Sequence, residues 1–162
     1  MCGGDKESFE KAKPILQGMG KNIVHCGSGG LGQATKICNN MLAGINALAA
    51  AEAMTMGERL GVSPDILYEV ISTSTGRSYI FETSNPMPDV SSTSPANNKF
   101  KPGFMAKLML KDLRLSQAAA QDAKTSTPLG AAATAAFQQL IDSGFGDLDT
   151  SSIIKVIKPE LK

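Results

Sequence analysis

The sequence contains no tryptophan, and only two tyrosines and six phenylalanines occur among its 162 residues. Little aromatic surface is therefore available for stacking on nucleic-acid bases. The net charge is +1, and the lysines are interspersed with acidic residues, so there is no basic stripe for a phosphate backbone either. Together these two absences argue against a nucleic-acid-binding protein.

Metal-binding and disulfide patterns are equally scarce. The chain has one histidine, His25, and three cysteines, Cys2, Cys26 and Cys38, which form no CxxC pair. An odd number of scattered cysteines argues against a disulfide framework, and a single histidine argues against a His/Cys metal site. We therefore expect no bound metal and a reducing compartment.

Long apolar runs are absent too. No run approaches the about 20 residues that a helix needs to cross a bilayer. The segment 41–53, rich in Ala and Leu, is interrupted by Gly44, Asn46 and Glu52. We expect no membrane partner. Met1 is followed by neither a signal peptide nor a basic amphipathic leader, so this N-terminus does not identify a compartment.

Helical periodicity dominates what is present. It predicts helices over residues 5–18, 30–60, 104–124, 128–143 and 150–157, and another that begins with Ser63 as N-cap and Pro64 at its first position. The helix over 30–60 would be about 45 Å long. Its Ala- and Gly-rich middle lets other helices approach closely, so we place it at the centre of a helical bundle. The fold class expected is mainly α.

Two further features qualify this helical pattern. Residues 85–103 hold four of the eight prolines together with many Ser and Asn, which predicts a long irregular loop. In the helix that follows this loop, the spacing of the apolar residues indicates a buried face made of Phe104, Leu108, Leu115 and Ala119.

A short apolar run over residues 22–26 is compatible with one β-strand, and a glycine-rich turn follows it. Gly27, Gly29 and Gly32 have the spacing G-x-G-x-x-G, the fingerprint of a dinucleotide-binding βαβ unit. Such a unit also needs a second strand ending in an acidic residue about 20 residues further on. Glu52 lies at that distance but inside the predicted long helix, so we reject the Rossmann interpretation of this turn.

The helix after the turn carries Gln33, Lys36 and Asn40 on one face. Taken alone, Lys36 is more typical of a solvated surface lysine, but because this face is otherwise Ala and Gly, it suggests a lysine partly withdrawn from water. Withdrawal favours the uncharged amine and would suit acid/base chemistry. The alternative is a simply solvated surface lysine. For Lys111 and Asp112, in the helix over 104–124, an ordinary amphipathic helix with surface ion pairs explains the pattern by itself.

Taken together, these residues resemble the C-terminal half of the β-hydroxyacid dehydrogenase family. The family's catalytic signature, G-x-x-G-x-G-x-x-x-K-x-x-x-N, is matched by Gly27, Gly30, Gly32, Lys36 and Asn40. The resemblance covers essentially the whole chain. It continues through the Ala-Glu-Ala of residues 51–53, Asn85-Pro86, and the block Phe104…Leu108…Lys111-Asp112-Leu113.

This resemblance implies an NAD-dependent oxidoreductase that acts on a small hydroxyacid. Lys36 would be the catalytic acid/base, taking the hydroxyl proton as hydride leaves for NAD. Asn40 and Gly32 would bind the substrate, and Phe104 and Lys111 would bind the cofactor.

Within the family, the run of residues 38–41 and the 85–103 loop favour the branch that oxidises 3-hydroxyisobutyrate to methylmalonate semialdehyde in valine degradation. Relatives acting on 6-phosphogluconate carry a histidine three residues after the lysine, where this chain has Asn39. Tartronate-semialdehyde and glyoxylate/succinic-semialdehyde reductases share the lysine and the asparagine, so they stay open as alternatives. A non-catalytic helical dimerisation module is a third.

The resemblance also implies how the chain is organised. Residues 1–26 resemble the final helix and strand of a Rossmann-type nucleotide-binding domain, and residues 27–162 an all-helical substrate and dimerisation domain. We expect a fragment that alone neither binds NAD tightly nor turns over. Family members associate through the helical domain, which implies a homo-oligomer. A eukaryotic member would be in the mitochondrial matrix and a bacterial one in the cytoplasm.

Overall fold

The computed structural model describes residues 1–161 and is mainly helical, as predicted. Contacts divide the chain into two compact units, Met1–Asn40 and Met41–Lys162. Within residues 1–161, no helix pairs the length of a bilayer crossing with the necessary apolar character. The elements in chain order are α1 (Lys6–Gln17), α2 (Leu31–Arg59), α3 (Pro64–Ser72), α4 (Tyr79–Thr83), the 3-10 helix η1 (Pro95–Asn98), α5 (Ala106–Asp122), α6 (Pro128–Asp142), the 3-10 helix η2 (Thr150–Ile153) and α7 (Ile154–Ile157).

The first unit holds α1 and the turn that opens α2. Asp5 caps α1, because its carboxylate accepts a hydrogen bond from the Ser8 N–H at 2.9 Å, and this bond lowers the pKa of the Asp5 carboxyl. Phe9 is buried and stacks on the ring of His25, with 4.7 Å between the ring centroids. These contacts fix α1 against the segment that precedes the glycine turn.

The strand predicted over residues 22–26 does not form. A single parallel bridge joins Cys2 and His25, in which the Cys2 N–H donates to the Val24 carbonyl at 2.9 Å and the Cys26 N–H donates to the Cys2 carbonyl at 2.7 Å. A strand needs a partner several residues long to pair its backbone groups. Among residues 1–161 the segment that pairs here is the short one before α1, so the prediction of a strand is wrong for this chain.

The predicted long helix is confirmed in α2, whose 29 residues give a length of about 44 Å. In the second unit, α2 contributes small buried side chains to a core that it shares with larger ones. This core includes Ala47, Ala50, Ala51 and Met54 of α2 with Leu113, Phe137, Leu140, Ile153 and Ile154. Gly44 shows how close the approach is, since a Cβ there would lie 2.9 Å from the Leu113 Cδ2 atom.

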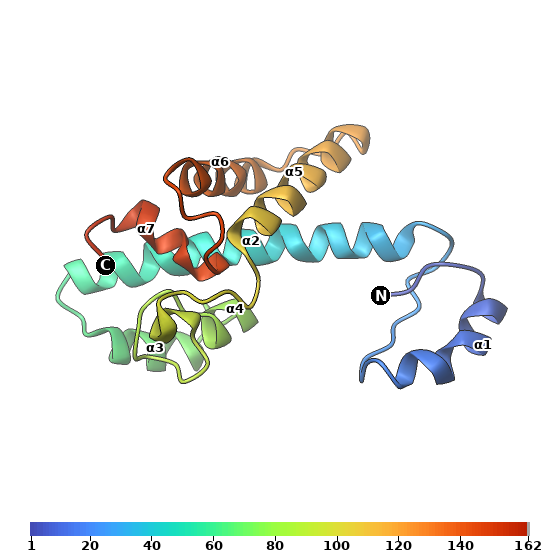
Figure 1. Ribbon diagram of the computed structural model, residues 1–162, viewed down its shortest axis with the longest axis horizontal. Coiled ribbons are helices and arrows are strands. Elements are labelled where there is room, and N and C mark those ends of the chain that lie inside the picture. Colours follow the sequence, from blue (N-terminus) through green and yellow to red (C-terminus); the bar gives the residue numbers. More distant parts are fainter. Residues whose placement is uncertain (162) are drawn as a thin grey trace. The chain divides into compact units, whose positions relative to one another are not determined.

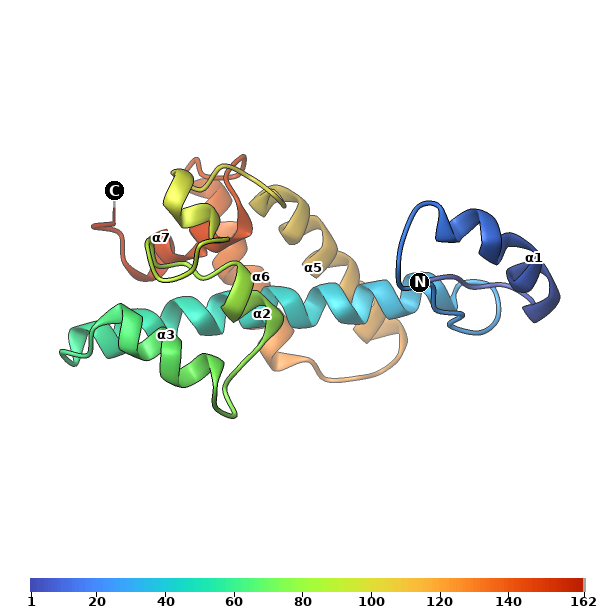
Figure 2. The same ribbon diagram turned by 90° about the horizontal axis from the view of Figure 1, so that it is seen from below.

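The helices of the second unit lie on two sides of α2. The pair α5 and α6 packs together on one side, and α3 and α4 lie on the other (Figures 1 and 2). The helix α4 was not predicted. The segment after it contains η1 and is held by its own hydrogen bonds, centred on the buried Asn85, whose side chain donates to the Phe81 carbonyl at 3.2 Å and accepts from the Met87 N–H at 3.1 Å.

The buried face of α5 differs from the predicted one. Phe104, Leu108 and Leu115 are 36%, 39% and 49% exposed. The buried residues of the helix are Ala106, Met109, Leu110, Asp112, Leu113 and Ser116. The prediction failed because α5 carries apolar residues on two faces and the buried face also contains the polar Asp112 and Ser116, so periodicity alone does not say which face meets the core. We call the exposed face, Phe104–Leu108–Lys111–Leu115, the α5 stripe.

Candidate functional site

The glycine-rich turn enters α2 directly, and three of its glycines are required by the backbone. Gly27 and Gly30 have φ angles of 109° and 88°, in the left-handed region that favours glycine. Gly32 is buried in the first turn of α2, where a Cβ would lie 2.9 Å from the Gly3 nitrogen and 3.2 Å from the Met1 carbonyl oxygen. A Cβ on Gly29, in contrast, would meet nothing within 4 Å.

The three required glycines therefore have the spacing G-x-x-G-x-G of the catalytic signature. The competing dinucleotide fingerprint needs a glycine at position 29, where the structure has room for a side chain. That fingerprint also does not require a glycine at position 30, where the backbone does. The backbone thus distinguishes two patterns that the sequence alone presents together.

Replacing Gly32 with alanine should destabilise the first unit by about 1–3 kcal/mol, because the new methyl group meets backbone atoms that have little room to move. Gly29→Ala is the matched control, and it should be neutral or stabilise the fold by about 0.4–1 kcal/mol. Urea unfolding of both variants, followed by circular dichroism, measures the difference. Equal stability of the two would contradict the packing role assigned to Gly32.

Lys36 and Asn40 lie one turn apart on the same face of α2, with Gln33 a turn earlier. The Asn40 side-chain oxygen accepts a hydrogen bond from the Asn39 amide at 3.1 Å. Lys36 is exposed and makes no hydrogen bond or ion pair with residues 1–161. The described residues leave the Lys36 side chain in solvent, so they do not supply the withdrawal from water that its Ala- and Gly-rich face suggested.

Phe104 and Lys111 belong to the second unit. Phe104 stands just before α5, and Lys111 lies two turns further along the α5 stripe. The Lys111 ammonium is 2.9 Å from the carboxylate of Asp112, which is 7% exposed, so a buried anion holds the lysine at the surface. The structure thus brings Gly32, Lys36 and Asn40 together in one unit, and Phe104 and Lys111 together in the other.

The hollows on the second unit include two that bear on function. One, of about 420 Å³, includes Lys111 and is lined by Lys107, Leu110, Lys111, Arg114, Leu115 and Ile141. Sequence reasoning missed Lys107 and Arg114 beside Lys111, although their spacing of i, i+4 and i+7 puts the three cations on one face. Lys107 pairs with Asp147, and Arg114 bonds Gln138.

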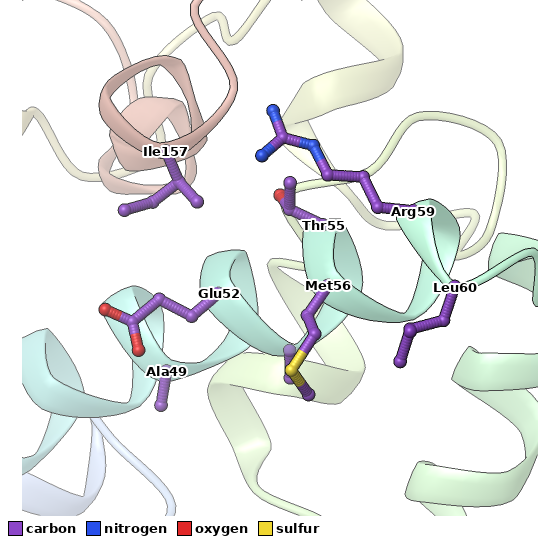
Figure 3. A pocket seen from close by; sticks show the side chains of 8 residues that line it. Ala49, Glu52, Thr55, Met56, Arg59, Leu60 and Ile157 are labelled. Carbon is purple, nitrogen blue, oxygen red and sulfur yellow. The ribbon is translucent and has the colours of Figure 1, made fainter.

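The other hollow is a groove of about 550 Å³ near the end of α2, and it contains none of the predicted site residues. Figure 3 shows Glu52, Thr55 and Met56 of α2, with Leu60 directly after the helix, on one side and Ile157 of α7 on the other. Its lining is mostly apolar. The Thr55 hydroxyl is buried and has no hydrogen-bond partner among the described residues.

A family model described as the NAD-binding part of NADP-dependent 3-hydroxyisobutyrate dehydrogenase matches residues 30–157. The chain belongs to this family. It is 41% identical over 159 residues to the NAD-dependent L-serine dehydrogenase of Pseudomonas aeruginosa, covering 98% of this chain and 53% of that protein. It is 39% identical over 160 residues to the mitochondrial 3-hydroxyisobutyrate dehydrogenase of Homo sapiens, covering 99% and 48%.

A solved structure, the 3-hydroxyisobutyrate dehydrogenase of Mycobacterium tuberculosis with L-serine, superimposes with a TM-score of 0.91 at 40% identity, covering 96% of this chain and 53% of that one. The chain spans about half the length of the curated relatives it matches. These findings confirm the 3-hydroxyisobutyrate dehydrogenase family predicted from the signature, together with NAD as its kind of cofactor. The matched region contains all the predicted site residues from Gly32 to Lys111.

Proposed function

We propose that this chain is the catalytic-lysine half of an NAD-dependent dehydrogenase that oxidises 3-hydroxyisobutyrate to methylmalonate semialdehyde, the step of valine degradation. The observation that carries the proposal is the glycine turn. Its three structurally required glycines, followed by Lys36 and Asn40 on one face of α2, reproduce the family's catalytic signature.

In this reaction the amine of Lys36 takes the proton of the substrate hydroxyl while the C–H hydrogen leaves as hydride. Bound NAD supplies the hydride acceptor. Asn40, one turn later, donates its amide to a substrate oxygen, and the backbone at Gly32, in the first turn of α2, favours the substrate carboxylate. Lys36 is solvated in the described residues, so a further domain would have to withdraw it from water and favour its uncharged form.

The α5 stripe fits the cofactor in chemical character. The ring of Phe104 and the side chain of Leu108 offer an apolar surface to a planar ring, and the ammonium of Lys111, held by Asp112, offers a positive charge to an anionic or carbonyl group. Phe104 and Lys111 therefore hold NAD at this stripe in the proposal.

L-serine is a second candidate substrate. The P. aeruginosa relative is named for it, and the M. tuberculosis structure is described with it. Serine and 3-hydroxyisobutyrate both carry a carboxylate and a hydroxymethyl group on the same carbon, and they differ in an ammonium against a methyl group. The same lysine chemistry serves both compounds.

The domain organisation is part of this proposal. Residues 1–26 form the end of a nucleotide-binding domain, and residues 27–162 form the substrate domain, a bundle around α2. Two observations support this division. The chain covers about half the length of its curated relatives, and the segment 22–26 pairs through one bridge, whereas a strand within a sheet would pair along its length.

The test joins this chain to the part of a relative that the chain does not cover. The portion of the P. aeruginosa relative that this chain does not match is fused ahead of Met1, and we call the product the joined protein. It should form NADH from 3-hydroxyisobutyrate or L-serine, measured by NADH absorbance, whereas the chain alone should not. NADH formation by the chain alone, or none by a folded joined protein, would refute the proposal.

We further propose that the second unit associates with a copy of itself through the apolar rim of the α2 groove. Met56 and Leu60, which line this groove, are 63% and 75% exposed. Leu60→Glu should weaken self-association at least about tenfold by light scattering, because it buries a charge. Leu129→Glu, at a 67% exposed site on α6, is the control and should leave association unchanged. Equal effects would contradict this surface.

A further inference from the structure

Asp149 is a buried carboxylate, 3% exposed, that lies directly before η2. Its Oδ1 atom accepts hydrogen bonds from the Ser151 N–H at 3.0 Å and the Ser151 hydroxyl at 2.9 Å. Its Oδ2 atom accepts from the N–H groups of Gly103 and Phe104, both at 3.0 Å. The Thr150 hydroxyl adds a longer bond to Oδ1, at 3.4 Å. Within residues 1–161 no cation pairs with Asp149, so hydrogen-bond donors stabilise its charge.

The second pair of bonds reaches 45 residues back along the chain, to the start of α5. Met105, the N-cap residue of α5, makes no capping bond with its own side chain. The first N–H groups of the helix are satisfied by the same distant segment, since the Ala106 N–H donates to the Leu148 carbonyl at 2.8 Å and the Lys107 N–H to the Gly146 carbonyl at 3.0 Å.

Both backbone polar groups of Phe104 are hydrogen-bonded. Its N–H donates to Asp149, and its carbonyl accepts from the Thr150 N–H at 2.9 Å. The residue as a whole is nevertheless 36% exposed, at the end of the α5 stripe. A fixed backbone at an exposed aromatic residue is the arrangement of a pre-organised contact surface.

We propose that Asp149 is a positioning residue for the cofactor, which acts by holding Phe104 and the first turn of α5 in place. This inference rests on the proposed function, in which Phe104 contacts NAD. Asp149 itself touches no cofactor or substrate atom. Its charge matters because five donors converge on its two oxygens, and an asparagine would turn its NH₂ group towards the donors on one of them.

The test compares variants of the joined protein by NADH fluorescence titration, in the Lys36→Ala background so that chemistry does not contribute. Asp149→Asn should weaken NADH binding about tenfold, similar to Phe104→Ala. The double variant, with Asp149→Asn and Phe104→Ala, should bind NADH at most about twofold more weakly than Phe104→Ala alone, because both changes remove the same contact with the cofactor. With Lys36 present, the KM for NAD should rise while kcat stays within about threefold.

Ser151→Ala is the matched control. It removes a bond to Oδ1 and lowers stability, but it leaves both bonds to the α5 start, so NADH affinity should not change. If Asp149→Asn does not fold, Asp149→Ser replaces it, because serine still caps η2 but does not reach Gly103 and Phe104. The expected affinity loss is the same.

Two contrary results are distinguishable. If the parent joined protein binds no NADH, the proposed function fails and this inference fails with it. If the parent binds NADH and Asp149→Asn binds it as tightly as Ser151→Ala does, or if its loss adds fully to that of Phe104→Ala, the positioning role alone is overturned.

Discussion

Replacing Lys36 with alanine is expected to lower the kcat of the joined protein by about 10²- to 10⁴-fold, the usual contribution of a positioned acid/base group. The substrate hydroxyl then loses the group that takes its proton as hydride leaves. The KM for the hydroxyacid should change much less, because Asn40 and the start of α2 still contact the substrate. Initial rates of NADH formation with 3-hydroxyisobutyrate and with L-serine measure both constants.

Two further variants isolate the chemistry of Lys36. Lys36→Arg keeps the positive charge but cannot give up its proton near neutral pH, so it should lose as much activity as Lys36→Ala. Lys21→Ala removes another exposed lysine of the same unit and should leave the rate unchanged. If Lys36→Ala retained the parent rate, the non-catalytic helical dimerisation module would replace the enzyme as the better interpretation.

The helices with strong local signals could be predicted from sequence to within about two residues. For α2 the signal was a proline-free run rich in Ala, Leu and Met, and for α6 it was a proline at the first helical position. The five-residue α4 was missed because it is too short to show a helical period. The signature of the site was equally local, since it occupies the glycine turn and the first few turns of α2 that follow it.

What failed depended on tertiary partners. The segment 22–26 has strand-forming residues, but among residues 1–161 it pairs through a single bridge. Lys36 lies on a face of α2 that the described residues leave in solvent. In α5, two polar residues, Asp112 and Ser116, lie on the buried face, which hid that face from a search for apolar spacing. Asp149 could have been recognised as a cap from the serine two residues later, but its bonds to Gly103 and Phe104 cross 45 residues.

Phe137→Ala is expected to cost about 3–5 kcal/mol of unfolding free energy, the largest stability effect among the changes proposed. Phe137 is fully buried, and it lies on the face of α6 that also buries Ala133 and Leu140. This face packs with α5 and the described core, in which Leu113 is fully buried as well. Removing the ring leaves a cavity between two helices whose backbones cannot easily close it.

The measurement is urea unfolding of the chain, followed by circular dichroism, with Leu129→Ala as the control on the same helix. Leu129 is 67% exposed, so its truncation should change the stability by no more than about 0.5 kcal/mol. Similar losses for the two variants would contradict the assignment of the α6 core face. Since α6 supports α5, a partly folded Phe137→Ala protein should also lose the ordered α5 stripe, and with it NADH affinity in the joined protein, whereas Leu129→Ala should keep both.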